Sequence, residues 1–134
     1  MSGKLKVLVV EPMKPCRVQE IPDTLEAMQQ TVGGDIEAIT SIRNGSAVVC
    51  NEMGKLLGLP YNRPLLDESG LLPLDILHGT FFIAGMSGEH FVSLTEEQIQ
   101  RYKDLYDNVM ALTAEAPAPQ EDRPNKKKKA APER

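Results

Sequence analysis

The segment 48–63, VVCNEMGKLLGLPYNR, holds most of the distinctive polar chemistry of the chain, and we expect the other elements to be arranged around it. Its first residues, with Ala47 before them, form an apolar run that predicts a buried strand. Glycines, a proline and polar residues follow, which is typical of a loop. The segment therefore predicts a buried strand that ends in a long loop. That loop carries Asn51, Glu52, Lys55, Asn62 and Arg63.

The length of the chain and its C-terminal composition predict one folded domain followed by a tail. The 134 residues suit a single domain. Residues 113–134 contain four prolines and many charges but no large apolar side chain. Such a segment buries too little apolar surface to offset the entropy lost on ordering. We therefore expect a globular domain at residues 1–112 and a disordered Pro/Lys-rich tail at 113–134.

The charge differs in sign between these two parts. The whole chain has a formal net charge of −4, and the tail has six basic and four acidic side chains, so residues 1–112 carry −6. An acidic domain disfavours contact with a phosphate backbone. The tail instead offers the run Lys126, Lys127, Lys128 and Lys129, which would attract nucleic acid weakly and without sequence preference. A solubilising role is the alternative for this run.

The two cysteines, Cys16 and Cys50, form no CxxC or zinc spacing, so we expect reduced, buried side chains. The N-terminal residues lack the apolar region of a signal peptide, and no apolar run approaches the roughly 20 residues that span a bilayer. We therefore expect a cytoplasmic protein with no membrane partner and no cofactor.

Apolar and alternating runs predict strands at residues 5–10, 16–21, 35–40, 46–51 and 80–85. The first two strands are expected to form one hairpin, and the next two another around Asn44-Gly45. The run 80–85 is apolar throughout, which indicates a central strand covered on both faces. Residues 90–92 form a short edge strand or lead into the last helix. The turn-rich segment 64–73 is expected to be a loop.

Two helices are expected from their capping residues. Asp23, followed three residues later by Glu26, predicts the start of a short helix that ends at Gly33-Gly34. Thr95 and Gln98 form a capping box for a longer helix that is expected to reach Leu112. The predicted fold is a small single-domain α+β protein. A mostly antiparallel or mixed sheet of about five strands packs against both helices.

Several motifs, in this order, resemble a known family. They are VVEP at 9–12, LE at 25–26 with VGGDIE at 32–37, CNEMGKL at 50–56, GLPYNR at 58–63, and DI at 75–76 with GTFFI at 79–83. The chain is similar over about Lys4 to Leu112 to an uncharacterised bacterial domain family, domain of unknown function 3846. The resemblance implies a small protein of bacteria, their phages or conjugative elements, without an assigned reaction. It implies nothing about the lysine-bearing tail.

The polar residues of the loop support two interpretations. Asn51, Glu52, Lys55, Asn62 and Arg63 would line a binding pocket, since loops at strand ends commonly carry such groups. Alternatively, Asn51 to Lys55 form a hairpin turn with Gly54 in the left-handed conformation. In that case Asn62 and Arg63 satisfy loop carbonyls or pair with Glu52.

Asp75 and His78 form a second candidate group, three residues apart, with His90 as a possible third member. They would bind a metal or move a proton, but there is no HxxxH spacing, and a polar cluster at a strand entry is the favoured interpretation. We therefore assign no metal site.

The known catalytic and phosphate-binding motifs are incomplete or misplaced in this sequence. Gly54-Lys55 lacks the residues of a Walker loop, and phosphate loops precede helices whereas Gly33-Gly34 follows one. Ser87 lies outside a GxSxG elbow, and an apolar run would raise the thiol pKa of Cys50. No catalytic residue is assigned.

The sequence thus favours a non-enzymatic binding or interaction protein of a phage or mobile element that acts on a host system through an unknown protein partner. The alternatives are a small-ligand binder or minor enzyme that uses the Asn51–Arg63 loop with Asp75 and His78, and a weak nucleic-acid binder that uses the lysine tail.

Overall fold

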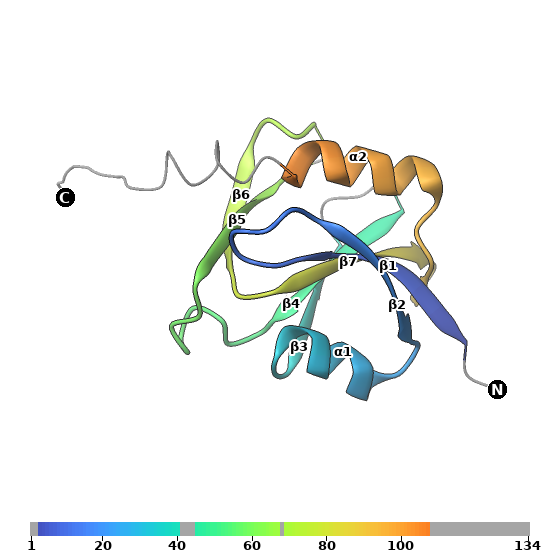
Figure 1. Cartoon of the computed structure of the whole chain (residues 1–134), viewed down its shortest axis with the longest axis horizontal. Helices are drawn as coiled ribbons and strands as arrows, with labels where there is room; N and C mark the ends of the chain where they lie inside the picture. Colours follow the sequence, from blue (N-terminus) through green and yellow to red (C-terminus); the bar gives the residue numbers. More distant parts are fainter. Residues whose placement is uncertain (1–2, 41–44, 68, 108–134) are drawn as a thin grey trace, which may run out of the picture.

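A computed structural model describes residues 3–40, 45–67 and 69–107. Along the chain, strands and helices follow one another in an order that begins with a hairpin and ends with a helix (Figure 1). The elements are β1 (Lys4–Val10), β2 (Arg17–Pro22), α1 (Leu25–Val32), β3 (Ile36–Ile39), β4 (Ser46–Asn51), β5 (Tyr61–Leu66), β6 (Pro73–His78), β7 (Phe81–Ser87), β8 (His90–Val92) and α2 (Glu96–Tyr106).

The strands form two antiparallel sheets. The large sheet has six strands in the order β2-β1-β7-β4-β3, with β8 also paired to β7. Strand β7 lies between β1 and β4, which confirms the central strand expected from its apolar sequence. Both expected hairpins, β1-β2 and β3-β4, are present. The α+β class is therefore confirmed.

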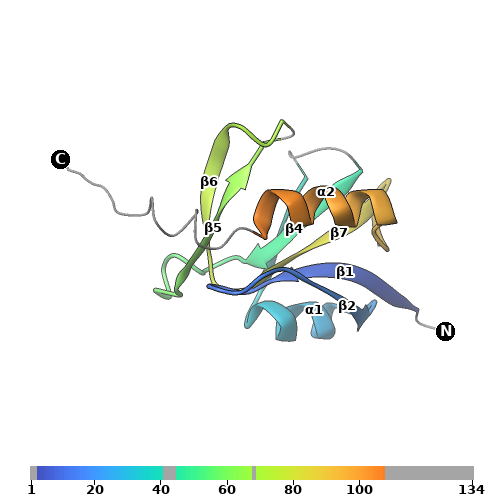
Figure 2. The same cartoon turned by 45° about the horizontal axis from the view of Figure 1, so that its top comes forward.

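Each face of the large sheet is covered by one helix. Strands β1, β4 and β7 are apolar on both faces, so each face needs a cover. Helix α1 packs against one face through Met28 and Val32, and α2 packs against the other through Ile99, Tyr102 and Tyr106. Figure 2 shows the two helices on opposite sides of the sheet.

The capping residues explain both helix starts, with one correction. Thr24, not Asp23, is the N-cap of α1, because its hydroxyl accepts a hydrogen bond from the amide of Ala27. Helix α2 begins as expected, with the full capping box of Thr95 and Gln98. The described part of α2 ends at Tyr106, so the expected extension to Leu112 and the tail 113–134 lie outside the described residues.

The main departure from expectation is the segment 61–78. Strands β5 and β6 form a separate two-stranded sheet, whereas we expected a loop at residues 64–73. Pro64 and Pro73 suggested a loop because proline cannot donate to a ladder, but a two-stranded sheet has two free edges that accommodate proline. This hairpin covers the same face of the large sheet as α2, through Leu65 and Leu77.

Strand β7 supplies the first prediction. Phe82 is fully buried against the α1 face, so Phe82→Ala removes an aromatic ring that no neighbour can replace. We expect the free energy of unfolding in urea to fall by about 3–5 kcal/mol. The control is Val18→Ala on the edge strand β2, where the side chain is 45% exposed and the expected loss is below about 1 kcal/mol. Similar losses for the two variants would contradict the central position of β7.

Candidate functional site

Strand β5 carries two polar residues into the interior. Tyr61 pairs with His78 and Arg63 with Leu77, so Asn62 is an extra residue on β5, as in a β-bulge. Neighbouring strand residues normally point to opposite faces, but here Asn62 and Arg63 are both only 1% exposed. The bulge therefore places both side chains inside the protein.

The guanidinium group of Arg63 donates hydrogen bonds to oxygens from three parts of the chain. Its Nε donates to the carbonyl of Tyr106 at 2.9 Å. Its Nη1 donates to Asn62 Oδ1 at 2.7 Å and to the carbonyl of Glu11 at 3.4 Å, and its Nη2 donates to the carbonyl of Lys14 at 2.6 Å. Arg63 thus links β5, the β1-β2 turn and the end of α2.

These acceptors explain how a cation is buried without an ion pair to any carboxylate of the described residues. Burial lowers the pKa of Arg63, but an arginine keeps its proton in proteins. The carbonyl of Tyr106 lies at the C-terminus of α2, where the helix dipole is negative. The carbonyls of Glu11 and Lys14 flank Met13, whose φ of 65° is unfavourable for a residue with a side chain. Arg63 therefore stabilises a strained turn.

Two asparagines have similar structural roles. The Nδ2 of Asn62 donates to the carbonyl of Val10 at 2.9 Å and to that of Gly79 at 2.8 Å. Asn51 is 6% exposed, donates from Nδ2 to the carbonyl of Val32, and accepts from the amide of Met53 through Oδ1. Asn62 and Arg63 thus satisfy backbone carbonyls, which was one of the two interpretations of the sequence.

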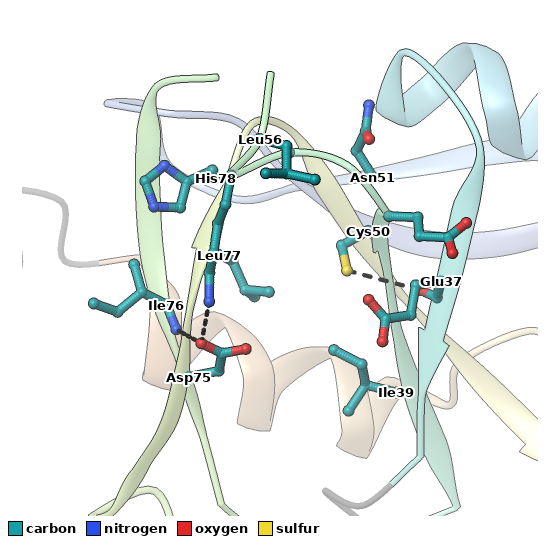
Figure 3. A pocket seen from close by; sticks show the side chains of 12 residues that line it. Glu37, Ile39, Cys50, Asn51, Leu56, Asp75, Ile76, Leu77 and His78 are labelled. Atoms are coloured by element: carbon teal, nitrogen blue, oxygen red, sulfur yellow. Dashed lines mark hydrogen bonds and ion pairs between the residues drawn. The ribbon is translucent and has the colours of Figure 1, made fainter. Parts of the chain in front are cut away.

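The remaining sequence-predicted residues gather at a groove of about 370 Å³. It lies between the β3-β4 side of the large sheet and strand β6, and we call it the β3-β6 groove. Glu37, Ile39 and Cys50 line one side, with Asp75 and Leu77 opposite (Figure 3). Glu52, Lys55 and His78 also line the groove, as does Asn51, whereas Asn62 and Arg63 do not.

The loop between β4 and β5 forms one end of this groove. It is not a hairpin turn, since β4 and β5 belong to different sheets. Gly54 is not left-handed; a Cβ atom there would approach the carbonyl oxygen of His78 to 2.8 Å. The left-handed residue is Gly58, with φ of 71°. Glycine is therefore required at 54 by close backbone packing.

The groove has an ion pair and two further carboxylates. Lys55 Nζ lies 2.5 Å from Asp75 Oδ1, and this hydrogen bond lowers the pKa of Asp75. Glu37 and Glu52 form no ion pair with the residues that the structure describes. The Nδ1 atom of His78 lies 3.0 Å from the carbonyl oxygen of Leu59. The groove therefore has an excess of negative charge.

In the described part of the chain, neither the two cysteine thiols nor the potential metal ligands are arranged for nucleophilic catalysis or metal binding. Burial raises the pKa of Cys50 to about 11 and that of Cys16 to about 12, so both thiols stay protonated at neutral pH. Among residues 3–40, 45–67 and 69–107, no cluster of three histidine, cysteine or acidic side chains is placed to hold a metal ion. His90 lies on β8 and does not line the groove with His78.

Comparison with protein families gives one match. The model of the family described as domain of unknown function (DUF3846) matches residues 5–107. The chain belongs to this family. No curated protein and no solved structure matches the chain. In the described part of this DUF3846 domain, no helix is long and apolar enough to cross a membrane.

Sequence reasoning missed several lining residues of the groove in this DUF3846 domain. Glu37 and Ile39 lie two residues apart on β3, so they share a face, and Ile76 belongs to a strand that was not expected. The two-residue spacing of Glu37 and Ile39 in a predicted strand could have shown that their side chains share a face. The position of β6 opposite β3 across the groove could not be predicted in this way, because it depends on how the second sheet packs on the first.

The contacts of Arg63 give the second prediction. Arg63→Met keeps much of the side-chain volume but leaves the buried carbonyl of Tyr106 and the partly buried carbonyls of Glu11 and Lys14 without their donor. We expect the free energy of unfolding to fall by about 3 kcal/mol or more. Arg17→Met is the control, because its ion pair with Glu11 is partly exposed to solvent and contributes below about 1 kcal/mol. Equal losses in the two variants would show that the hydrogen bonds of Arg63 contribute no more to stability than an ion pair at the surface.

The ion pair in the groove gives the third prediction. In Lys55→Met, the pKa of Asp75 should rise toward its ordinary value of about 3.9, as followed by NMR titration of the carboxyl carbon. A lowered carboxyl pKa stabilises the fold above the unfolded pKa, and this contribution is lost as the pH falls through the folded pKa. Both side chains are about half exposed, so the contribution is below about 1 kcal/mol.

Asp67 is the internal control for this titration. Its pKa is also lowered, but by the hydroxyl of Ser69 and by backbone amides, which the substitution leaves in place. The pKa of Asp67 should therefore stay constant in Lys55→Met. An unchanged pKa of Asp75 would contradict the ion pair.

Proposed function

We propose that this chain is a non-enzymatic binding protein whose β3-β6 groove receives a segment of a protein partner. The observation that carries the proposal is that exposed apolar side chains lie at one groove with carboxylates that form no ion pair within the described part of the chain. Leu56 is 80% exposed and Ile76 is 48% exposed, and both line it. The buried side chains of Asn62 and Arg63 instead donate their hydrogen bonds to backbone carbonyls.

Exposed leucine and isoleucine side chains support a macromolecular partner. Single exposed apolar residues are common, but apolar residues gathered around a concave site are typical of interfaces. Burying both side chains against a partner would remove apolar surface from water, which is the main driving force for association. The polar rim of Lys55 and Asp75 would contribute specificity.

The state of the titratable groups favours binding over catalysis. A general base is most effective when its pKa lies near the working pH, but the ion pair with Lys55 lowers the pKa of Asp75. A nucleophilic thiol needs a lowered pKa, and burial raises that of Cys50. Neither group is therefore tuned for acid–base or nucleophilic chemistry.

The phage or mobile-element setting and an action on a host system belong to this proposal, and they rest on the family resemblance. A small ligand is the second candidate occupant, since the groove volume of about 370 Å³ lies within the usual range of ligand sites. Nucleic-acid binding by Lys126–Lys129 concerns residues outside those that the structure describes.

The fourth prediction tests the groove with a random library of twelve-residue peptides displayed for selection. We expect the intact protein to enrich binders that lose affinity for the double variant Leu56→Asp, Ile76→Asp, because buried carboxylates oppose docking. Val18→Asp is the matched control: it places the same charge at an exposed apolar site on β2. It should leave binding unchanged.

Selection of peptides that bind both variants equally would remove the groove from consideration. Failure to select any binder, together with a small molecule whose NMR shift changes map to the groove residues, would favour the small-ligand candidate. Both results contradict the proposed function.

A further inference from the structure

Strand β3 has a free edge that is continuous with the groove. The amide of Glu52 donates to the carbonyl of Asp35 at 2.9 Å, which extends the ladder between β3 and β4 by one pair. Hydrogen-bonded and non-hydrogen-bonded pairs alternate in an antiparallel ladder, so Glu37 and Ile39 direct their backbone groups toward β4. The backbone N–H and C=O groups of Ile36 and Ala38 therefore point away from β4, toward the outer edge of β3.

No described strand pairs with this outer edge. The opposite edge of the sheet is β2, where Pro22 and charged side chains oppose the addition of another strand. Strand β3 contains neither proline nor lysine, and Glu37 is its one charged residue. The edge of β3 is therefore the more open of the two to strand addition.

The side chains beside this edge define the chemistry of a partner. Glu37 and Ile39 point toward the groove, which Glu52 and Leu56 also line. The carboxylates of Glu37 and Glu52 have no ion-pair partner in the described chain. A basic side chain would pair with them, an apolar one would contact Ile39 and Leu56, and a phosphate-bearing or anionic lipid surface would be repelled.

We infer that the partner adds an extended segment antiparallel to β3, as a further strand of the large sheet. Its main chain bonds the outward N–H and C=O groups of Ile36 and Ala38, and its groove-facing positions carry basic and apolar side chains. This inference rests on the proposed function and specifies the partner as a basic, apolar β-strand. Such main-chain pairing gives affinity, and alternate side chains give specificity.

The fifth prediction uses the synthetic peptide acetyl-TKTVTKT-amide, whose alternate positions place two lysines and a valine on one face. We expect NMR titration to shift the amide signals of Ile36 and Ala38 and to slow their hydrogen exchange. Acetyl-TETVTET-amide should not bind, because its glutamates face Glu37 and Glu52. The double variant Glu37→Gln, Glu52→Gln should bind the lysine peptide several-fold more weakly and with less dependence on salt.

Ala38→Pro tests the main-chain bonds directly. It removes an outward N–H that takes no part in the ladder with β4, so the fold should tolerate it. We expect it to weaken binding about tenfold or more, the equivalent of a lost hydrogen bond. Ala38→Val keeps the N–H and should bind within about twofold of the parent. From the peptide side, acetyl-TKPVPKT-amide keeps the lysines and valine but should not bind.

The outcomes separate this inference from the function on which it rests. Equal binding to Ala38→Pro and Ala38→Val, or unchanged signals at Ile36 and Ala38, would overturn strand addition. If library-selected peptides bind the groove and acetyl-TKTVTKT-amide does not, strand addition fails and the proposed function stands. If neither kind of peptide binds, both fail.

Discussion

The fold depends on a buried charge that must be satisfied. The guanidinium of Arg63 is 1% exposed and bonds to backbone carbonyls of the β1-β2 turn and of α2. An unsatisfied buried cation costs several kcal/mol, so the elements that supply these oxygens are held in one arrangement. Asn62 extends the same network to Val10 and Gly79. The β5-β6 hairpin is thereby fixed against the large sheet rather than added to its edge.

This position of the hairpin creates the surface with functional interest. Strand β6 lies across from β3 and β4 instead of pairing with β3, which leaves a groove between them and a free edge on β3. The residues that hold the hairpin are buried, whereas Leu56 and Ile76 beside the groove are exposed. The chain thus separates structural polar groups, in the interior, from the exposed groups at the groove, where we propose that a partner binds.

Local patterns in the sequence predict the elements better than their assembly. The apolar run at Phe81 and the capping box at Thr95 each rest on neighbouring residues, and both expectations are confirmed. Pro64 and Pro73 led us to expect a loop, but they belong to a hairpin, because a two-stranded sheet tolerates proline at its free edges. The burial of Arg63 could not be predicted, since arginine is rarely buried and its acceptors are far away in sequence.

The exchange of the Arg63 Nε–H with water, measured by NMR, tests this account most directly. Arg17 serves as the reference in the same spectrum, because its Nε donates to Gln19 on the exposed surface. We expect the Arg63 proton to exchange as slowly as the backbone amides of the central strand β7, since both require unfolding to reach water. If the Nε–H of Arg63 exchanged as fast as that of Arg17, the buried, hydrogen-bonded position of the Arg63 guanidinium would be contradicted.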